Sequence, residues 1–224
     1  MNALTARRDI PRVSADILRR FAGVPTGFVA DAQNRRGAID HRIRPILAPA
    51  PFVGSALTVS TPPSDNLAPF AAISLAKPGD VLVVSAESCE SAAVMGDLMV
   101  GMARNAGCVA VVTDSMVRDI EGLEQVGLPV YARGLTPSSP YKNGPGKIGF
   151  PVSIGNVVIE SGDVLVGDRN GVVVVPRATI AEVLKALDGI KAKETEMDAA
   201  VAGGATQPAW LPDYLAKNPI RLVD

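Results

Sequence analysis

Two short segments of the chain carry residue types that could together bind an anion and a hard cation. One is Gly96-Asp97 and the other is the dipeptide Arg118-Asp119. Carboxylate oxygens are ligands that Mg²⁺ prefers, and a guanidinium grips a carboxylate through two parallel hydrogen bonds. Brought together by the fold, these segments would form a site for a metal ion and a small carboxylic acid.

The sequence between the two segments predicts how they meet. Residues 97–106 have the pattern of a short helix, Gly107 ends it, and residues 108–113 form an apolar strand followed by a turn at 114–117. Asp97 therefore opens one helix, and Arg118-Asp119 opens the next. In a right-handed β-α-β-α arrangement both points lie at the edge where parallel strands end. Helix N-termini at that edge also offer backbone amides to an anion.

The remaining pattern predicts one α/β domain without a dividing linker. The expected elements are helices beginning near Ser14 and Thr26, strands at 53–60, 81–84 and 128–131, a helix at 66–76, a long loop at 134–150, short strands at 152–154, 157–159, 164–166 and 172–175, and a helix from Ala178. The turns between the four short strands are typical of antiparallel pairing. The tail from Gly203 holds Trp210 and is apolar, so we expect it to pack on this subunit or on a neighbour.

Composition narrows the class of protein. Apolar residues make up 47% of the 224 residues, enough for a large core, while aromatic residues at 4% leave aliphatic side chains to fill it. The net charge is −1 without a basic block, which disfavours nucleic acid as a direct partner. Cys89 and Cys108 form neither a disulfide framework nor a zinc motif. His41, the only histidine, lies in a Pro- and Arg-rich turn, which disfavours a His-based triad.

Targeting signals are not evident in the sequence. The first ten residues are charged and lack an apolar signal core. No run approaches the roughly 18 consecutive apolar residues that suggest a membrane span. We therefore expect a protein without membrane partners in a reducing compartment, the cytoplasm.

The order and spacing of several segments resemble the RraA-like family, which includes the regulator of ribonuclease activity A and class II pyruvate aldolases such as 4-hydroxy-4-methyl-2-oxoglutarate aldolase. The resemblance covers roughly residues 20–195 and is carried by residues 53–59, 65–67, 78–81, 96–119, 128–130 and 162–176. It implies a β/β/α swivelling-domain-like layered sandwich, a single domain with mixed sheets over residues 1–224. It also implies homotrimers or homohexamers with sites between subunits, and places the helix and tail at 178–224 in subunit contacts.

The resemblance also assigns roles to the acids and the arginine. Asp119 matches the acid that ligates Mg²⁺ or Mn²⁺, and Asp97 matches a second acid that acts on the metal through a water. Arg118 matches the arginine that binds the pyruvate carboxylate. Each of the two acids also has a simpler interpretation, because an acid at a helix start is favoured by the helix dipole. Arg118 could equally form a surface ion pair with Asp119 or Glu121.

Further residues complete the expected binding site. The amides of Leu98 and Met99, after Gly96, are placed to bind the same carboxylate, although any helix start offers such amides. Asn66 could line the pocket, or act only as a helix cap. Family aldolases also take an acid from the neighbouring subunit, for which Glu194 and Glu196 are candidates, but a solvated helix face explains both.

One departure from the family pattern concerns the turn before Arg118. The family often has Asp-Gly where this chain has Asp114-Ser115. Because serine carries a Cβ, a positive-φ turn here would cost more than with glycine. We therefore expect a different loop at this point.

The expected function is a divalent-metal-dependent class II lyase that acts on 2-oxo acids through a pyruvate enolate. Both aldol cleavage of 4-hydroxy-4-methyl-2-oxoglutarate and decarboxylation of oxaloacetate pass through this enolate. The alternative is a non-catalytic, RraA-like regulator that binds an RNA-degrading ribonuclease. A methyltransferase label sometimes attached to the family is disfavoured, because no Gly-rich loop for a nucleotide-type cofactor is present.

Overall fold

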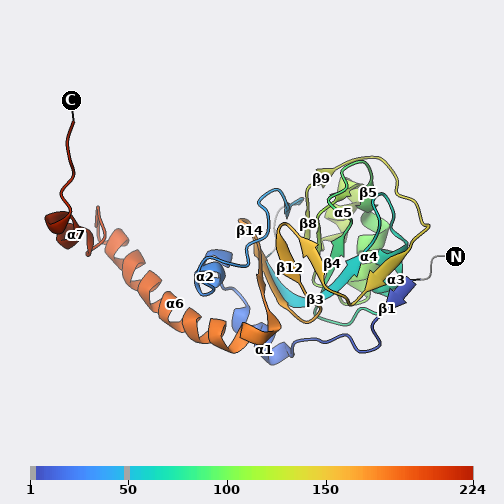
Figure 1. The fold of residues 1–224 in the computed structure, drawn as a ribbon, viewed down its shortest axis with the longest axis horizontal. Coiled ribbons are helices and arrows are strands. Elements are labelled where there is room, and N and C mark those ends of the chain that lie inside the picture. Colours follow the sequence, from blue (N-terminus) through green and yellow to red (C-terminus); the bar gives the residue numbers. More distant parts are fainter. Residues whose placement is uncertain (1–3, 48–50, 224) are drawn as a thin grey trace.

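A large mixed sheet forms the centre of the molecule in the computed structural model, which describes residues 4–47 and 51–223 (Figure 1). Four parallel strands form its middle: β3 (Phe52–Ser60), β4 (Asp80–Ser85), β6 (Ala110–Thr113) and β8 (Val130–Ala132). The other members of this sheet are β2 (Arg44–Pro45), β10 (Gly146–Ile148), β1 (Leu4–Ala6), β13 (Val164–Asp168) and β14 (Gly171–Val175). Strands β13 and β14 form the predicted antiparallel hairpin, and β13 pairs with β3.

Two smaller sheets accompany the central one. Strands β11 (Val152–Ile154) and β12 (Val157–Ile159) form an antiparallel hairpin, as their turn predicted. Strands β5 (Ala93–Met95), β7 (Met116–Val117) and β9 (Gly134–Leu135) form a three-stranded parallel sheet. This small sheet carries the candidate site.

The central strands are buried on both faces. Along β4, Leu82 and Val84 enter the hydrophobic cluster beneath α3 (Leu67–Ile73), α4 (Asp97–Asn105) and α5 (Ile120–Val126). Their neighbours Val81 and Val83 enter a second cluster, with the β11–β12 hairpin. This alternation follows from the two-residue period of a strand, and burial on both faces explains the near-continuous apolar sequence.

A third hydrophobic cluster lies outside the β13–β14 hairpin. Here α1 (Ala15–Phe21), α2 (Thr26–Asp31) and the first half of α6 (Ile180–Ala202) cover the strands. A short 3₁₀ turn at Arg177–Thr179 leads into α6, and α7 (Leu211–Lys217) follows it. Layers of helices and sheets around shared clusters confirm the predicted α/β sandwich with mixed sheets.

The expected loop at 134–150 is wrong in part, because it contains β9 and β10. Strands of two and three residues are too short to show an alternating pattern. Gly146 on β10 allows close packing, since a Cβ there would overlap the side chain of Ala68. This segment thus adds an edge strand to the small parallel sheet and an inner strand, between β1 and β3, to the central sheet. The N-terminal strand β1, which pairs with β10, was also not predicted.

Candidate functional site

The small parallel sheet brings the two predicted segments together. Met95 of β5 and Val117 of β7 are register partners, so Gly96-Asp97 and Arg118-Asp119 leave the same edge of the sheet. The prediction that both lie where parallel strands end is therefore confirmed. The sheet is different from the expected one: Met116 and Val117 form a strand of their own, whereas we expected a turn after the 108–113 strand.

Asp97 begins α4 and packs against α5. Its Oδ1 accepts a hydrogen bond from the amide of Leu98 at 2.6 Å. Its carboxylate lies against Gly122 of α5, where a Cβ would overlap Oδ2 of Asp97. A glycine inside a helix costs about 1 kcal/mol relative to alanine, and here its missing side chain makes room for the acid.

The carboxylate of Asp119 also lies against a glycine, in this case Gly96 of the other segment. A Cβ on Gly96 would overlap Oδ2 of Asp119. Asp119 itself adopts a left-handed backbone, with φ of 62° and ψ of 53°, at the N-cap of α5. Such a conformation costs a non-glycine residue about 1–3 kcal/mol and is concentrated at functional sites. Asp119 thus lies against the glycine that precedes Asp97, and Asp97 lies against a glycine of the helix that follows Asp119.

Arg118 is held in place beside Asp119. Its Nε donates to Oδ2 of Asp119 at 3.2 Å, and its Nη1 donates to Oγ of Ser139. The two charged side chains remain 36% and 41% exposed. The ion pair with Asp119, which was the simpler interpretation of Arg118, therefore forms. It lies within the candidate site. A guanidinium has five N–H donors, so two such contacts orient it and leave donors for a ligand.

The helix amides are less available than expected. The amide of Leu98 is bonded to Asp97, so an anion would have to compete with that carboxylate. The side chain of Leu98 is 76% exposed, whereas Met99 is buried in the core. The amide of Met99 lies in the first turn of α4 and remains a candidate donor.

Asn66 lies at the N-cap of α3 and is only 6% exposed. It makes no side-chain capping bond, and its buried Oδ1 has no hydrogen-bond partner among the residues described. Buried polar atoms are almost always paired, which supports a binding role over a cap. The loop that supplies Ser139 to Arg118 continues to Tyr141, whose carbonyl accepts from the Asn66 amide at 3.0 Å. This loop connects Asn66 to the site.

A pocket of about 320 Å³ lies beside Arg118 and Asp119. Its other lining residues are Ile120, Glu121, Leu135, Thr136 and Pro137. It is large enough for a small organic acid and opens directly onto the arginine and the acid.

The remaining candidates do not join the site within one chain. Glu194 and Glu196 lie on α6, outside the site. The side chain of His41 is almost fully exposed beside Asp40. Ser115 is buried and is not among the positive-φ residues, so the expected strain at the Asp114-Ser115 turn does not arise. Its hydroxyl donates to the carbonyl of Cys89 at 2.6 Å.

Two residues of the site were missed by sequence reasoning. Gly122 interrupts the helical pattern of α5, and such a glycine is a signal for close packing. Ser139 lies in the 134–150 segment, whose length marked it as functional or disordered without selecting a residue.

The donor set fits a hard cation. Asp119 and Asp97 offer carboxylate oxygens at one edge, and Mg²⁺ commonly binds through one or two carboxylates while keeping several waters. Within residues 4–47 and 51–223, no cluster of three or more His, Cys, Asp or Glu side chains is placed to hold a metal. A Mg²⁺ or Mn²⁺ ion here would therefore depend on these two acids, water and substrate.

Comparison with known proteins decides the family. A model of the RraA-like family, described as Aldolase/RraA, matches residues 26–174. The chain belongs to the RraA-like family. A protein of Halalkalibacterium halodurans, provisionally named a 4-hydroxy-4-methyl-2-oxoglutarate aldolase, is 36% identical over 183 residues, covering 82% of this chain and 85% of that one.

Solved structures of other proteins are also similar to this RraA-like chain. An uncharacterized protein from Pseudomonas syringae pv. tomato matches with a TM-score of 0.75 and 26% identity, over 87% of this chain and 96% of that one. The RNA-processing inhibitor RraA of Thermus thermophilis matches with a TM-score of 0.64 and 25% identity, over 68% and 93%. The family thus includes proteins named as aldolases and as regulators. In the part of this RraA-like chain that the structure describes, no helix is long and apolar enough to cross a membrane.

Proposed function

We propose that this RraA-like protein is a divalent-metal-dependent carbon–carbon lyase that acts on 2-oxo acids. The observation that carries the proposal is the placement of Asp97 against Gly122 and of Asp119 against Gly96, with Arg118 and Asp119 side by side on the wall of the pocket. The similarity to a provisionally named 4-hydroxy-4-methyl-2-oxoglutarate aldolase supports it.

The chain would bind the substrate through its carboxylate. Arg118 offers its guanidinium to that carboxylate, and its contacts to Asp119 and Ser139 fix the plane of the group in advance. Mg²⁺ or Mn²⁺, held by Asp119 and through a water by Asp97, would supply Lewis-acid stabilisation of the negative charge that develops on the 2-oxo oxygen. The positive charge of Arg118 would add to that stabilisation.

Aldol cleavage requires one proton to be taken from the substrate, whereas decarboxylation of an ionised carboxylate does not. In an aldol cleavage the C3–C4 bond breaks, the 4-hydroxyl loses its proton, and the electron pair of the bond forms the enolate of pyruvate. Asp97, acting through a water, would accept that proton as general base. In oxaloacetate decarboxylation the same bond breaks with loss of CO₂. Protonation of the enolate at C3 releases pyruvate in both reactions.

The test is a pyruvate-release assay on 4-hydroxy-4-methyl-2-oxoglutarate and on oxaloacetate. We expect release from at least one of them with Mg²⁺ or Mn²⁺. Absence of turnover on both, in folded and metal-supplied protein, would contradict the lyase and favour the alternative, a non-catalytic regulator that binds a ribonuclease. That alternative is supported by the structural similarity to the RraA of Thermus thermophilis.

We further propose that the protein works as a homotrimer or homohexamer in the cytoplasm. The exposed aromatic and aliphatic side chains of the C-terminal region support an oligomer, because a monomer would leave them in water. Light scattering at micromolar concentration should give the mass of three or six chains. A monomer would contradict the assembly and with it a site shared between subunits.

A further inference from the structure

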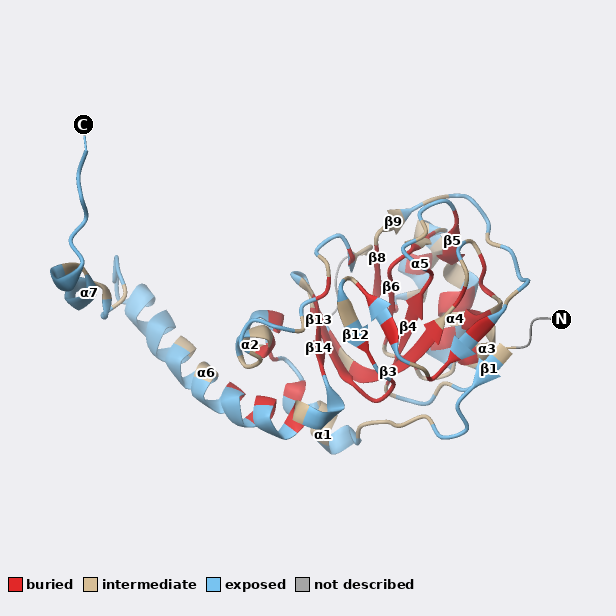
Figure 2. Ribbon diagram, in the orientation of Figure 1, coloured by how far each residue is buried: buried red, intermediate tan, exposed pale blue. Residues whose placement is uncertain are grey.

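The C-terminal part of the chain forms an arm that leaves the body of the protein. The first half of α6 packs through Ile180, Val183, Leu184 and Leu187. Beyond Ile190, α6 has no buried residue (Figure 2). At about 1.5 Å per residue, its 23 residues span roughly 35 Å. Figure 1 shows α7 at the far end of this arm, away from α1 and the sheets.

The far end of the arm presents an aromatic knob, which we define as Trp210, Asp213, Tyr214 and Lys217. The two rings pack edge to face, with centroids 6.1 Å apart. They nevertheless remain 61% and 55% exposed. Residues three, four and seven positions apart share a helix face, so Asp213 and Lys217 flank the rings. Aromatic side chains of this kind dominate the energetics of protein interfaces.

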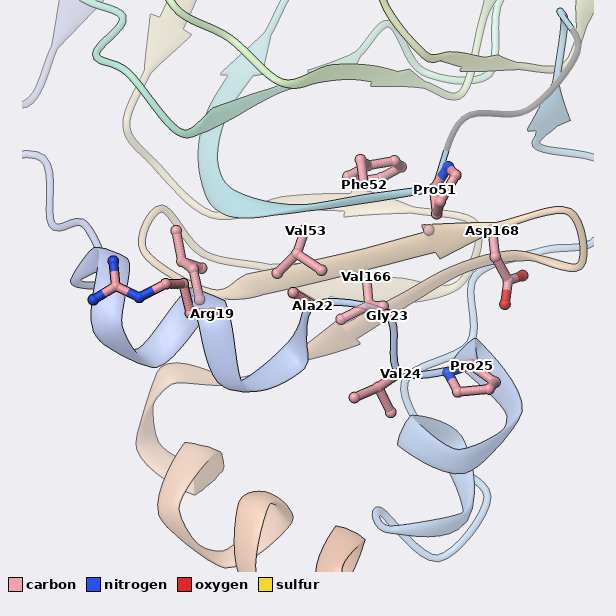
Figure 3. Close-up of a pocket in the computed structure, with 12 residues that line it drawn as sticks. Arg19, Ala22, Gly23, Val24, Pro25, Pro51, Phe52, Val53, Val166 and Asp168 are labelled. Atoms are coloured by element: carbon pink, nitrogen blue, oxygen red, sulfur yellow. The ribbon is translucent and has the colours of Figure 1, made fainter. Parts of the chain in front are cut away.

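An apolar groove of about 500 Å³ lies on the body, between α1 and strands β3 and β13. Figure 3 shows Ala22, Val24, Val53 and Val166 between Arg19 at one end and Asp168 at the other. The floor of the groove is formed by the buried strand residues Phe52 and Val166. The carboxylate of Asp168 is fixed by the amide and hydroxyl of Thr26 at 2.9 and 2.8 Å.

We propose that this groove receives the aromatic knob of a second copy of the chain. The groove is apolar between the carboxylate of Asp168 and the guanidinium of Arg19, which also pairs with the exposed Asp16 of its own helix. The knob is aromatic between an acid and a base. Asp213 would then face Arg19, and Lys217 would face Asp168. The knob does not reach the groove of its own chain, because α6 starts beside that groove and carries α7 away from it (Figure 1).

Trp210 is the only tryptophan of the chain, so its fluorescence reports on the knob directly. In the full-length protein at micromolar concentration we expect blue-shifted emission and protection from acrylamide. Ala22→Glu puts a longer, acidic side chain into the groove near Asp213, and should shift the emission to the red and restore quenching. The matched control is Ala178→Glu, the same change at an exposed alanine outside the groove, which should leave the emission unchanged.

Mixing two variants separates a second copy from the same chain. Ala22→Glu protein keeps its tryptophan but has a blocked groove, whereas Trp210→Ala protein has an open groove and no tryptophan. If the knob binds a second copy, mixing them returns the blue shift; if it folds back on its own chain, mixing changes nothing. The proposal is overturned by emission that is fully exposed in the wild type, by emission insensitive to Ala22→Glu, or by no recovery on mixing.

Charge reversal gives an independent check on the orientation. Arg19→Glu and Asp213→Arg should each increase quenching of Trp210, and the double variant should restore protection. Two single variants that leave quenching at the wild-type level would contradict the assigned orientation of the knob. Circular dichroism on each variant confirms that the chain is folded.

Discussion

The carboxylate of Asp119 lies against Gly96, so closely that a Cβ on residue 96 would overlap its Oδ2. This contact joins the two segments that sequence reasoning had paired only through topology. It also fixes the residue that precedes Asp97, so the positions of the two acids depend on each other.

Gly96→Ala should displace Asp119 and reduce pyruvate release by about 100-fold, since a shift near 1 Å can cost that much. Gly101→Ala, on the same helix, is the matched control. A Cβ there meets only Cγ2 of Val126, at 3.6 Å, which is ordinary contact. Steady-state kinetics should therefore separate the two variants. Equal rates for both would show that the position of Asp119 does not govern turnover.

Gly122→Ala should act on Asp97 instead, because its Cβ would overlap that carboxylate. We expect a lower kcat with a smaller change in metal affinity, as for Asp97→Asn, if Asp97 works through a water. Asp119→Ala should in contrast abolish metal-dependent turnover. Titration with Mn²⁺ and kinetics on the three variants test this division, and equal loss of metal binding in all of them would contradict it.

Arg118→Lys keeps the positive charge but loses the planar group that bonds a carboxylate twice. It should therefore raise KM and lower kcat together. Arg118→Ala should be worse in both. Because the side chain is partly exposed, folding should survive, with circular dichroism as the check. A folded Arg118→Ala protein with wild-type rates would remove Arg118 from the site.

The two cysteines should differ sharply in reactivity. Burial tends to raise the pKa of the Cys89 thiol, but hydrogen bonds from Ser64, Ser91 and nearby amides outweigh it and lower that pKa to about 7. Burial raises the pKa of Cys108 to about 12, and the charge of Asp80 adds to it. Iodoacetamide should thus modify Cys89 with a rate that rises through pH 7, while Cys108 stays unmodified. Mass spectrometry of the peptides measures both; modification of Cys108 in folded protein would contradict its burial.

Stability should depend on a buried ion pair that is not part of the candidate site. Arg12 donates to both oxygens of Asp80, at 3.1 and 2.8 Å, and the Asp80 side chain is fully buried. Arg12→Ala leaves that carboxylate without its charged partner and should lower the free energy of unfolding by about 3 kcal/mol. Urea denaturation measures the loss. Asp16→Ala, which breaks the pair with Arg19 where both side chains are exposed, is the control and should shift the midpoint far less.

Sequence reasoning predicted the elements whose residues repeat a clear pattern. The valines of β14 alternate between two clusters, and the stripe of α6 from Ile180 to Leu187 faces the third. It did not predict β7 or β9, because two residues show no alternation. The left-handed backbone of Asp119 was also beyond reach, since an aspartate at a helix start is compatible with an ordinary cap.

The candidate site was predicted as far as chain order allows. Asp97, Arg118 and Asp119 meet where parallel strands end, as expected. The contacts that orient them come from residues distant in the sequence, Gly122 and Ser139. Such contacts depend on how α4, α5 and the following loop pack. The tail illustrates the same limit. Its apolar sequence predicts packing on this subunit or on a neighbour, and the structure shows that α7 does not pack against the sheets and helices of its own chain.

The most direct test of the account is metal dependence of pyruvate release. Protein treated with EDTA and then freed of chelator should release no pyruvate from oxaloacetate or from 4-hydroxy-4-methyl-2-oxoglutarate above the uncatalysed rate. Adding Mg²⁺ or Mn²⁺ should restore turnover in the wild type and not in Asp119→Ala. If the metal-free protein turns over either substrate as fast as the metal-loaded protein, the proposed mechanism is wrong.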